Sequence, residues 1–561
     1  MAKKDKYKSY TKEQLISKIV KLEKSSYGLV WEDKPEDIAD ICEKELPVLT
    51  EIKSKEIKYS KKEPTHLIIE GDNYHSLYTL NFTHKKNIDV IYIDPPYNTG
   101  NNTWRYNNNF VDKEDRFKHS KWLSFMHKRI KLAKRLLSDE GIFVCAIDEY
   151  EIASLKLMLD KIFGEANRIG LVTVVHNPKG RNLSKFFSSN SEFMLVYAKK
   201  ISMAKFNDVA IDEDKIASFD LSDNEGKYRL EPYIRIRTTW LRTNKPKNYY
   251  PIYVSKDLKD ITLKHNDNYF KILPKTSDGK DYSWKNISST FNRLNKNGYF
   301  CAIKENNNIK IFHKYREKQV FKNVWTNKKY HSEFNGTNLL KKILGENCFD
   351  YPKSIFLMED IFKIISKRNS IILDFFAGSG TTGHAVLKLN DEDNGKRQFI
   401  ICTNNENNIC EDVTYPRIKK VIDGYNETKG IPANVKYYRT DFVPNILTDN
   451  DKRTLVLQST ELLCIAENTF EVVRECNKFD FSIFKNSKQH TAIIYDEDYI
   501  INCCDEINKI NPKAKLVIYV FSYDHTYEDD DFKTLKVNFK VKPIPEAIIN
   551  VYRKLTKLRN K

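Results

Sequence analysis

The sequence lacks several patterns that would place it in common protein classes. None of its 561 residues belongs to an apolar run long enough to span a membrane, and its first residues carry charge without the apolar stretch of a secretory signal. Its ten cysteines form no Cys-x-x-Cys pair, so we expect reduced, packed thiols and no metal site. Internal repeats and a nucleoside-triphosphate phosphate loop are also absent. These absences favour a cytoplasmic protein that binds no membrane.

Positive charge is what the sequence has in excess. It contains 94 Lys and Arg against 76 Asp and Glu, which gives a net charge of +18. This balance favours a polyanionic partner such as nucleic acid, although a lysine-rich proteome would produce a similar excess. The length suits two to four domains, each with a core of its own.

The most informative stretch is Ile-Tyr-Ile-Asp-Pro-Pro-Tyr-Asn-Thr-Gly at 91–100. The apolar residues before Asp94 predict the buried end of a parallel strand, which the two prolines terminate because they cannot donate to a sheet ladder. The resulting stiff loop presents the Asp94 carboxylate, the carbonyls of Pro95 and Pro96, and the Tyr97 ring. A Pro-Pro turn that merely closes a strand is the alternative interpretation.

Such a loop suits the activation of an exocyclic amine. The amine of adenine is a poor nucleophile, because its lone pair is delocalised into the ring. Acceptors for its two N–H groups, here the Asp94 carboxylate and the Pro95 carbonyl, would localise that lone pair and meet the positive charge that develops on nitrogen. Tyr97 would stack on the face of the flipped base.

At these residues the sequence resembles DNA-modifying enzymes. Asp-Pro-Pro-Tyr at 94–97 is similar to the catalytic tetrapeptide of adenine-N6 DNA methyltransferases, and the longer stretch 92–100 resembles the modification subunits of type III restriction–modification systems. The resemblance implies S-adenosylmethionine as the methyl donor and double-stranded DNA as the substrate. It also implies a homodimer and, as a candidate partner, a separate helicase–nuclease restriction subunit.

A second motif begins at Asp374, where an apolar run leads into a glycine-rich turn and the start of a helix. Gly378, Gly380 and Gly383 satisfy Gly-x-Gly-x-x-Gly, and the acidic Glu406 follows near the offset expected for a ribose ligand. The pattern alone is shared with NAD and FAD enzymes, so a dinucleotide-dependent oxidoreductase is one alternative. The turn also resembles the S-adenosylmethionine loop of amino-methyltransferases.

The order of the motifs, with the catalytic loop first and an insert before the glycine loop, resembles that of β-class methyltransferases. On this resemblance Asp72 meets the adenine of the cofactor, Lys353 lies beside its methionine end and Glu406 holds its ribose. The body of the cofactor would be lined by Asp374, Phe376, Gly378 and Gly380. Cytosine-N4 transfer is the closest alternative, and Asp rather than Ser at position 94 favours adenine by resemblance.

Strands that alternate with helices predict a doubly wound, mostly parallel α/β sheet, which the resemblance identifies as the Rossmann-like methyltransferase fold. The predicted organisation has an inserted target-recognition domain and a small C-terminal α/β domain. The resemblance implies dimerisation or docking of a partner subunit for the C-terminal domain, and plain packing is the alternative role. The predicted parts are an N-terminal helical arm (1–60), the catalytic half (61–200), the target-recognition domain (201–345), the cofactor half (346–440) and the C-terminal domain (441–561).

Basic and aromatic residues interleave in the insert. This composition suits phosphate contacts together with the reading of base edges, and an ordinary β-rich insertion is the alternative. The candidates for DNA binding are Arg235, Arg237, Arg242, Lys245 and Lys247.

Overall fold

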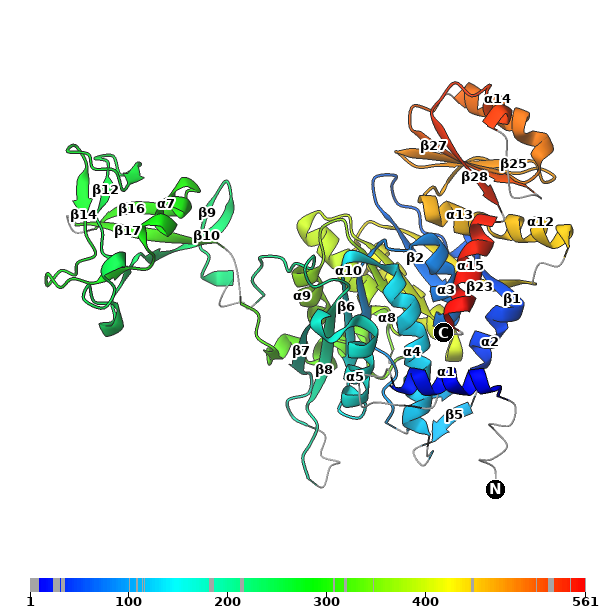
Figure 1. Ribbon diagram of the computed structural model, residues 1–561, viewed down its shortest axis with the longest axis horizontal. Coiled ribbons are helices and arrows are strands. Elements are labelled where there is room, and N and C mark those ends of the chain that lie inside the picture. The colour runs from blue at the N-terminus through cyan, green and yellow to red at the C-terminus, as the bar shows by residue number, and fades with distance from the viewer. Residues whose placement is uncertain are drawn as a thin grey trace. The chain divides into compact units, whose positions relative to one another are not determined.

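A computed structural model describes the chain as two units, each with a hydrophobic core of its own (Figure 1). The larger unit contains Met1–Asn207 and Lys322–Lys561, and the smaller unit is Asp208–Phe321. No helix in the described part of the chain is both long enough and apolar enough to cross a membrane. The structure describes all residues except 1–9, 24–30, 32–35, 100, 107–108, 113–114, 116, 181–185, 212–215, 306–307, 317–319, 347, 445–447, 511, 523–528, 545 and 560–561.

A ten-stranded sheet forms the centre of the larger unit, in the order β1-β23-β2-β20-β19-β3-β6-β8-β7-β18. The strands from β23 to β6 are parallel, whereas β8 is antiparallel to both of its neighbours. The predicted doubly wound, mostly parallel sheet is therefore confirmed. The strands are β1 (Glu45–Glu51), β2 (Thr65–Glu70), β3 (Ile88–Ile93), β6 (Leu137–Ile147), β7 (Arg168–Val175), β8 (Ser191–Ala198), β18 (Val324–Trp325), β19 (Ile371–Asp374), β20 (Gln398–Thr403) and β23 (Asn434–Pro444).

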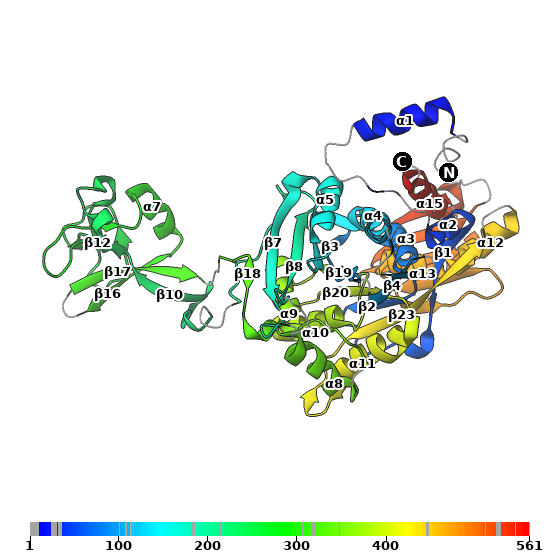
Figure 2. The ribbon, with the colours of Figure 1, turned by 90° about the horizontal axis from the view of Figure 1, so that it is seen from below.

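Helices cover both faces of this sheet, as Figure 2 shows for α3, α4 and α5 on one face and α8 to α11 on the other. Ile91 and Ile93 of β3 belong to the same core cluster as Trp122 of α4, whereas the ring of Tyr92 lies 6.1 Å from that of Phe362 in α9. Successive side chains of a strand point to opposite faces, so a strand covered on both sides is apolar throughout. The helices are α3 (Asn73–Thr83), α4 (Lys118–Leu136), α5 (Ile152–Phe163), α8 (Asn338–Leu344), α9 (Ile355–Ile365), α10 (Thr381–Asp393) and α11 (Tyr415–Asp423).

The N-terminal segment contains a strand that the prediction of a helical arm missed. Helices α1 (Lys12–Glu23) and α2 (Asp37–Lys44) are followed by β1, which pairs antiparallel with the distant β23 at the edge of the sheet. Val48 and Leu49 of β1 are buried, and Pro47 is tolerated because an edge strand can lack a backbone donor. The pairing partner lies hundreds of positions away, so local periodicity alone favoured helix.

The smaller unit is rich in short strands around an aromatic core. The rings of Tyr233 and Trp284 stack with centroids 5.3 Å apart, and those of Phe291 and Phe300 stack at 4.6 Å. Its elements are β9 (Leu221–Asp223), β10 (Gly226–Pro232), β11 (Ile234–Arg235), β12 (Ile252–Val254), β13 (Ile261–Thr262), β14 (Phe270–Ile272), β15 (Ser283–Trp284), α7 (Ser288–Lys296), β16 (Phe300–Glu305) and β17 (Asn308–Arg316).

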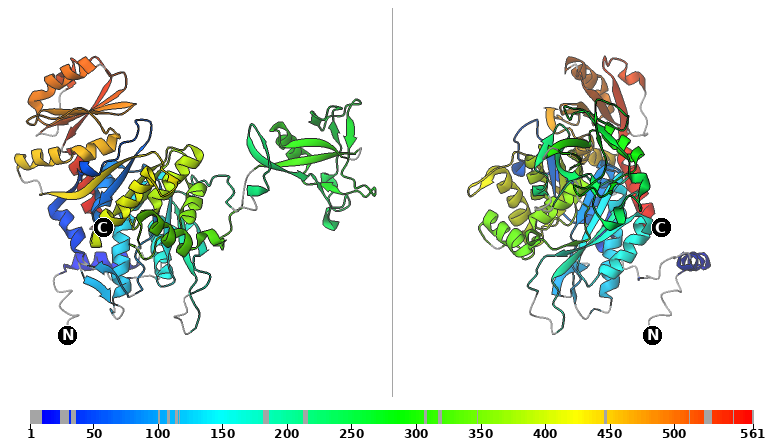
Figure 3. Two further views of the ribbon diagram at one scale, coloured as in Figure 1. Left: turned by 180° about the vertical axis from the view of Figure 1, so that it is seen from behind. Right: turned by 90° about the vertical axis from the view of Figure 1, so that its left-hand side faces the viewer.

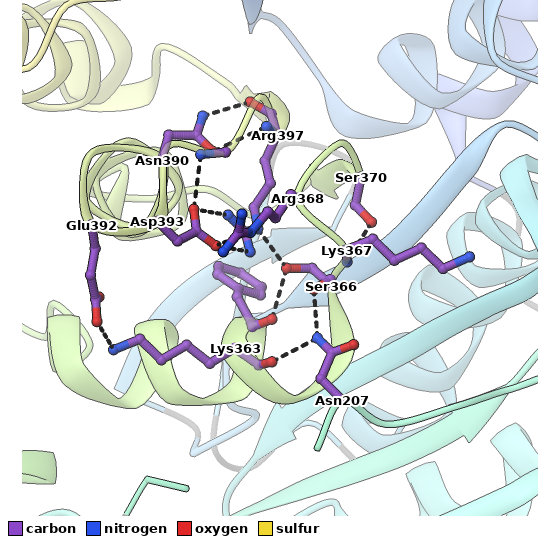
Figure 4. A network of polar contacts seen from close by, with 12 residues as sticks. Asn207, Lys363, Ser366, Lys367, Arg368, Ser370, Asn390, Glu392, Asp393 and Arg397 are labelled. Carbon is purple, nitrogen blue, oxygen red and sulfur yellow. Dashed lines mark hydrogen bonds and ion pairs between the residues drawn. The ribbon is translucent and has the colours of Figure 1, made fainter. Parts of the chain in front are cut away.

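The chain leaves the larger unit at Asn207, which is held at the C-terminal end of α9 (Figure 4). The backbone N–H of Asn207 donates to the Ile364 carbonyl at 2.8 Å, and its side-chain amide donates to the carbonyls of Lys363 at 2.8 Å and Ser366 at 2.7 Å. These bonds satisfy carbonyls that a helix end leaves open. Beyond the smaller unit, β18 already returns to the main sheet beside β7, so this unit is shorter at both ends than the predicted 201–345 domain.

The C-terminal segment forms a second sheet, in the order β24-β25-β26-β27-β28, within the larger unit. From it the red helix α15 in Figure 3 reaches the blue N-terminal elements. There the Tyr552 hydroxyl donates to the Pro47 carbonyl at 2.7 Å, and the Tyr78 hydroxyl donates to the Tyr552 carbonyl at 3.3 Å. Its elements are α12 (Asp449–Gln458), α13 (Thr460–Glu467), β24 (Glu471–Arg474), β25 (Phe481–Lys485), β26 (Gln489–Ile494), α14 (Ile500–Ile510), β27 (Lys515–Phe521), β28 (Phe539–Ile544) and α15 (Glu546–Arg559).

Candidate active site

Asp94 directly follows β3, which lies between β19 and β6 in the parallel part of the main sheet. Open α/β sheets bind their ligands at this edge, outside the carboxyl ends of the strands. After Pro95 and Pro96 end the strand, the indole N–H of Trp122 donates to the Pro96 carbonyl at 2.9 Å. Because Trp122 is fully buried in α4, the loop is held from behind by the core. A hairpin of β4 (Asn101–Tyr106) and β5 (Asn109–Asp112) comes next in the chain.

Asp94 belongs to a cluster of four polar side chains, of which Glu192 is buried and the other three are partly buried. The Tyr97 hydroxyl donates to Asp94 Oδ1 at 2.8 Å, and Lys353 Nζ lies 3.3 Å from the same oxygen. Lys353 also donates to the Tyr97 hydroxyl at 2.7 Å and forms an ion pair with Glu192. The loop after β3, the start of β8 and the segment before α9 each contribute to this cluster. It contains two carboxylates and one ammonium, so its net charge is negative when all three are ionised.

Burial and charge oppose each other in this cluster. Burial raises the pKa of Asp94, Lys353 lowers it in part, and Glu192 adds to the rise, so the pKa of Asp94 is raised overall. Burial alone would also raise the pKa of Glu192, but Lys353, His176 and the hydrogen bond from Tyr97 together outweigh burial and lower it. The two carboxylates in turn raise the pKa of Lys353 against its own burial. Lys353 therefore stays charged at a depth where a lone lysine would lose its proton.

The structure shows which atoms surround the predicted residues Asp94, Tyr97 and Lys353. Both contacts to Asp94 use Oδ1, so its other carboxylate oxygen takes part in neither. The Tyr97 ring is oriented by its hydroxyl and has Lys353 Nζ 5.1 Å from its centroid, and the stacking of this ring on a base stays a prediction. Lys353, predicted beside the methionine end of the cofactor, lies against Asp94. Glu192 was missed, and its signal in the sequence was a lone carboxylate at the start of an apolar strand.

The glycine-rich turn joins β19 to α10. Gly378 and Gly380 have φ of +49° and +76°, a region that residues with a side chain enter at a cost. The Asp374 carboxylate accepts from the backbone N–H of Phe376 at 2.9 Å and from the Thr382 hydroxyl at 2.5 Å. Burial raises the pKa of Asp374 to about 7. Asp374 therefore shapes the turn through bonds to the turn itself.

Two residues of the segment after β20 donate hydrogen bonds to the glycine-rich turn and the start of α10. Neither was predicted from the sequence. The Thr414 hydroxyl donates to the Gly378 carbonyl at 2.6 Å. Arg417 of α11, which is fully buried, donates to the Ser379 carbonyl at 3.2 Å and to the Thr381 hydroxyl at 2.8 Å. No local pattern marks them, because an arginine in an amphipathic helix usually faces solvent.

The pairing of β3 with β19 brings the two motifs together. Ile91 faces Leu373 across this ladder, so the strands end side by side at Asp94 and Asp374, and the Asp94 charge contributes to the raised pKa of Asp374. The amide of Asn73 in α3 also donates to the Phe375 carbonyl at 3.1 Å. Residues far apart in the sequence thus form one edge of the sheet.

Asp72 and Glu406, the predicted adenine and ribose ligands, follow the neighbouring strands β2 and β20. Asp72 caps α3 by accepting from the Tyr74 backbone N–H at 2.7 Å, and Arg129 Nη2 lies 3.3 Å from the same carboxylate oxygen. Glu406 begins a short helix after β20, and the next two residues have positive φ. Both side chains therefore sit at the carboxyl edge, and their contacts with a cofactor stay predictions.

The five predicted DNA contacts lie within one short stretch of the smaller unit. The guanidinium of Arg235 and the ammonium of Lys245 lie 5.6 Å and 5.7 Å from the centroid of the Trp240 ring. Arg242 lies 4.3 Å from the centroid of the Tyr249 ring, and its Nη1 is 3.1 Å from an oxygen of the Asp281 carboxylate. The remaining two candidates, Arg237 and Lys247, are exposed.

No group of three His, Cys, Asp or Glu side chains in the described part of the chain is placed to hold a metal ion.

Known proteins resemble this chain in sequence and in structure. A family model described as DNA methylase matches residues 88–415. The type II methyltransferase M.KpnI of Klebsiella pneumoniae is 32% identical over 379 residues, which are 64% of this chain and 88% of that protein. The Mod subunit of the type III restriction-modification enzyme EcoPI of Escherichia phage P1 is 30% identical over 449 residues, which are 72% of this chain and 68% of that protein. The crystal structure of the M1.HpyAVI–SAM complex is similar at 15% identity with a TM-score of 0.28, over 64% of this chain and 100% of that one.

Proposed function

The chain belongs to the DNA methylase family, and from this premise we propose that it transfers a methyl group from S-adenosylmethionine to the N6 amine of adenine in duplex DNA. The observation that carries the proposal is the meeting of the Asp94 loop and the glycine-rich turn at the ends of adjacent strands, β3 and β19. Methyl transfer to a base needs an activated amine and a bound methyl donor at one place, and this edge of the sheet holds a candidate group for each.

The glycine-rich turn has the form that a bound nucleoside needs. A Cβ built on Gly378 would lie 3.2 Å from the Phe349 ring, and one on Gly380 would lie 3.3 Å from Thr414, so side chains there would crowd the turn. Glycines let the backbone approach a ligand closely. S-adenosylmethionine supplies an electrophilic methyl group on a sulfonium. Asp72, Phe376 and Glu406, with Lys353 and the turn, are the residues that we expect to hold it.

The Asp94 cluster is suited to receive the amine. As the amine attacks, its nitrogen becomes positive, and the cluster meets that charge with two carboxylates against one ammonium. Lys353 and Tyr97 hold Asp94 Oδ1 in place, so the carboxylate needs little reorganisation when the base arrives. We expect the Pro95 carbonyl to accept the second N–H of the amine, since the Pro96 carbonyl already accepts from Trp122.

Two other functions were open at the level of sequence. Cytosine-N4 transfer uses a parallel attack by an amine, and Asp rather than Ser at position 94 continues to favour adenine. A dinucleotide-dependent oxidoreductase would explain the glycine-rich turn but neither the Asp94 cluster nor the match to the DNA methylase family.

The type III relatives suggest partners as well as chemistry. We propose that the chain is the modification and specificity subunit of such a system, that it forms a homodimer in the cytoplasm, and that a separate restriction subunit docks on it. The smaller unit, Asp208–Phe321, would read the target sequence through its basic and aromatic residues. The net charge of +18 supports a polyanionic partner.

One experiment tests the proposed reaction. Purified protein is incubated with labelled S-adenosylmethionine and unmethylated genomic DNA, and the modified base and its sequence context are read by nucleoside analysis and modification sequencing. We expect N6-methyladenine at one short recurring sequence. N4-methylcytosine would show that the alternative is correct, and an absence of labelled DNA would refute methyl transfer altogether.

A further inference from the structure

The connection between β7 and β8, residues 176–190, carries two adjacent phenylalanines in solvent. Phe187 is 98% exposed and Phe186 is 83% exposed. Among the large apolar side chains of the described residues, Phe187 has the highest exposed fraction. Adjacent exposed rings are unfavourable in water, and apolar surface of this kind commonly marks a site that binds a partner.

This connection lies at the same edge of the sheet as Asp94. β6 and β7 are both antiparallel to β8, so β7 runs parallel to β6 and β3 and ends at the same edge. The Asn177 N–H donates to the Asn190 carbonyl at 3.2 Å, and the Ser189 hydroxyl donates at 3.1 Å to Glu149, which follows β6. In Figure 1 the coloured parts of the connection continue below β7 and β8, on the side where β5 is drawn.

A short, constrained path joins the phenylalanines to the catalytic cluster. Glu192, the second residue of β8, forms the ion pair with Lys353 and lies only a few positions after Phe187. The two arms of the connection approach each other closely, since a Cβ built on Gly180 would lie 2.5 Å from Ser188 Oγ. The backbone of β8 therefore ties Phe187 to the position of the residues around Asp94.

The sequence of the connection has only positive charge. Residues 176–190 include Lys179, Arg181 and Lys185 and no Asp or Glu. A stretch of sequence that combines cationic and apolar side chains complements duplex DNA, which presents phosphates outside and apolar base faces inside. A partner protein or an uncharged surface would not need this combination.

We propose that Phe187 acts as a wedge that enters the DNA base stack beside the target adenine and stabilises the flipped-out state. This inference rests on the proposed function, because only an enzyme that works on a base inside a duplex must extrude it. Flipping breaks one base pair and the stacking on both faces of the adenine. A phenyl ring that occupies the vacated space restores part of that stacking and blocks the return of the base. Phe187 is thus a positioning residue, and it does not touch the reacting atoms.

The test compares Phe187→Ala with the unaltered protein on two duplexes that contain the methylated sequence found by modification sequencing. One duplex is intact, and the other has an abasic site opposite the target adenine, so that less energy is needed to extrude the base. We expect Phe187→Ala to slow single-turnover methyl transfer about ten- to hundredfold on the intact duplex and only about twofold on the abasic one. Phe187→Trp should stay near the unaltered rate.

A second readout and a matched control complete the design. With 2-aminopurine in place of the target adenine, Phe187→Ala should lower the fluorescence of the bound intact duplex, because fewer bases are flipped. Phe479→Ala, which removes another exposed phenyl ring in the C-terminal sheet region, should leave both readouts unchanged.

The outcomes separate this inference from the proposed function. If the unaltered protein modified adenine in neither duplex, the proposed function itself would be wrong, and the wedge with it. If it modified both and Phe187→Ala matched it on the intact duplex, the wedge would be excluded. Equal losses on the two duplexes would also exclude it, because a general defect in binding or folding does not depend on the base opposite the target.

Discussion

The candidate catalytic edge of the larger unit and the basic stretch of the smaller unit, residues 235–247, differ in how their charged side chains are exposed and paired. At the edge, the Lys353 side chain is 12% exposed and lies between the carboxylates of Asp94 and Glu192. In the smaller unit, the Arg242 side chain is 57% exposed and its guanidinium lies over the ring of Tyr249. Buried charges act on one another strongly, whereas exposed charges are screened by salt.

This difference suits different roles for the two regions, one in the chemical step and one in DNA binding. Charges that are buried and mutually held suit a step in which small displacements change the rate. Exposed cations next to aromatic rings suit a surface that binds a polyanion through many contacts. Each such contact contributes a small part of the binding free energy. Single substitutions should therefore have large effects at the edge and small ones in the smaller unit.

The largest effect should come from Asp94→Ala. The substitution removes the carboxylate that we propose meets the amine, and losing one preorganised electrostatic partner typically costs about 10²–10³ in rate. Labelled methyl transfer should fall by at least that factor, while titration of S-adenosylmethionine and DNA shift assays should stay within a few-fold. The rate of Asp94→Asn, which keeps the side-chain shape and one acceptor oxygen, should lie between those of Asp94→Ala and the unaltered protein. Near-normal turnover in Asp94→Ala would refute the catalytic assignment.

Lys353→Met should have the next largest effect, and it should depend on pH. Without the ammonium, the carboxylates of Asp94 and Glu192 lack the positive charge that lies between them, so the pKa of Asp94, already raised, rises further. Because the proposed reaction needs the Asp94 carboxylate ionised, Lys353→Met should lose activity at a higher pH than the unaltered protein when the solution is acidified, and it should regain activity as the pH rises. Each unit of pKa shift corresponds to about tenfold in activity below the pKa.

The control for this prediction is Lys353→Arg, which keeps the positive charge and should keep the pH profile near that of the unaltered protein. A uniform loss of activity in Lys353→Met at every pH would contradict the electrostatic role of Lys353 and would indicate a role in packing or in holding the cofactor.

Arg417→Met should have a moderate effect confined to the cofactor. Arg417 donates to Ser379 and Thr381 in and after the glycine-rich turn, and a hydrogen bond from a charged donor is worth about 1.5–3 kcal/mol. We expect the KM for S-adenosylmethionine to rise about tenfold or more with little change in kcat. The thermal midpoint should be followed in parallel, and a fall in kcat with unchanged KM would contradict this role.

The smallest effects should come from the smaller unit. Arg237→Ala and Lys247→Ala should each weaken DNA binding a few-fold and lower the salt dependence of binding, by a slope of about 0.9 for each phosphate that the protein no longer neutralises. The measurement is DNA affinity across a range of salt concentrations. Lys488→Ala, an exposed lysine of the C-terminal sheet region, is the matched control and should change neither value. If Arg237→Ala or Lys247→Ala lowered turnover as much as Asp94→Ala, the proposed difference between the two regions would be refuted.

Prediction from sequence was correct where a short run of residues determines its own backbone conformation. The apolar run that ends in Pro95 and Pro96 had to be a buried strand followed by a stiff loop, and Asp94 lies at the end of β3. The glycine-rich run after Asp374 indicated a turn between a strand and a helix, and Gly378 and Gly380 lie in the turn that joins β19 to α10. The parallel sheet followed from alternating strands and helices.

Prediction failed where the deciding partner is far away in the chain. β1 is a strand because β23 pairs with it, although its neighbours in sequence are helical. The smaller unit ends before residue 322 because β18 pairs with β7, and no change of composition marks that point. Such pairings depend on long-range contacts that a local pattern does not encode.

The sequence by itself determined the chemistry that this protein offers, because the residue types and their spacing in the two motifs set the carboxylate, the rigid loop and the glycine-rich turn. Only the tertiary structure decided the electrostatics of the site. Lys353 and Glu192 reach Asp94 from separate segments, and Arg417 reaches the turn from a later helix. The pKa of a buried group depends on which charges surround it in space, and the folding of the sheet brings those charges together.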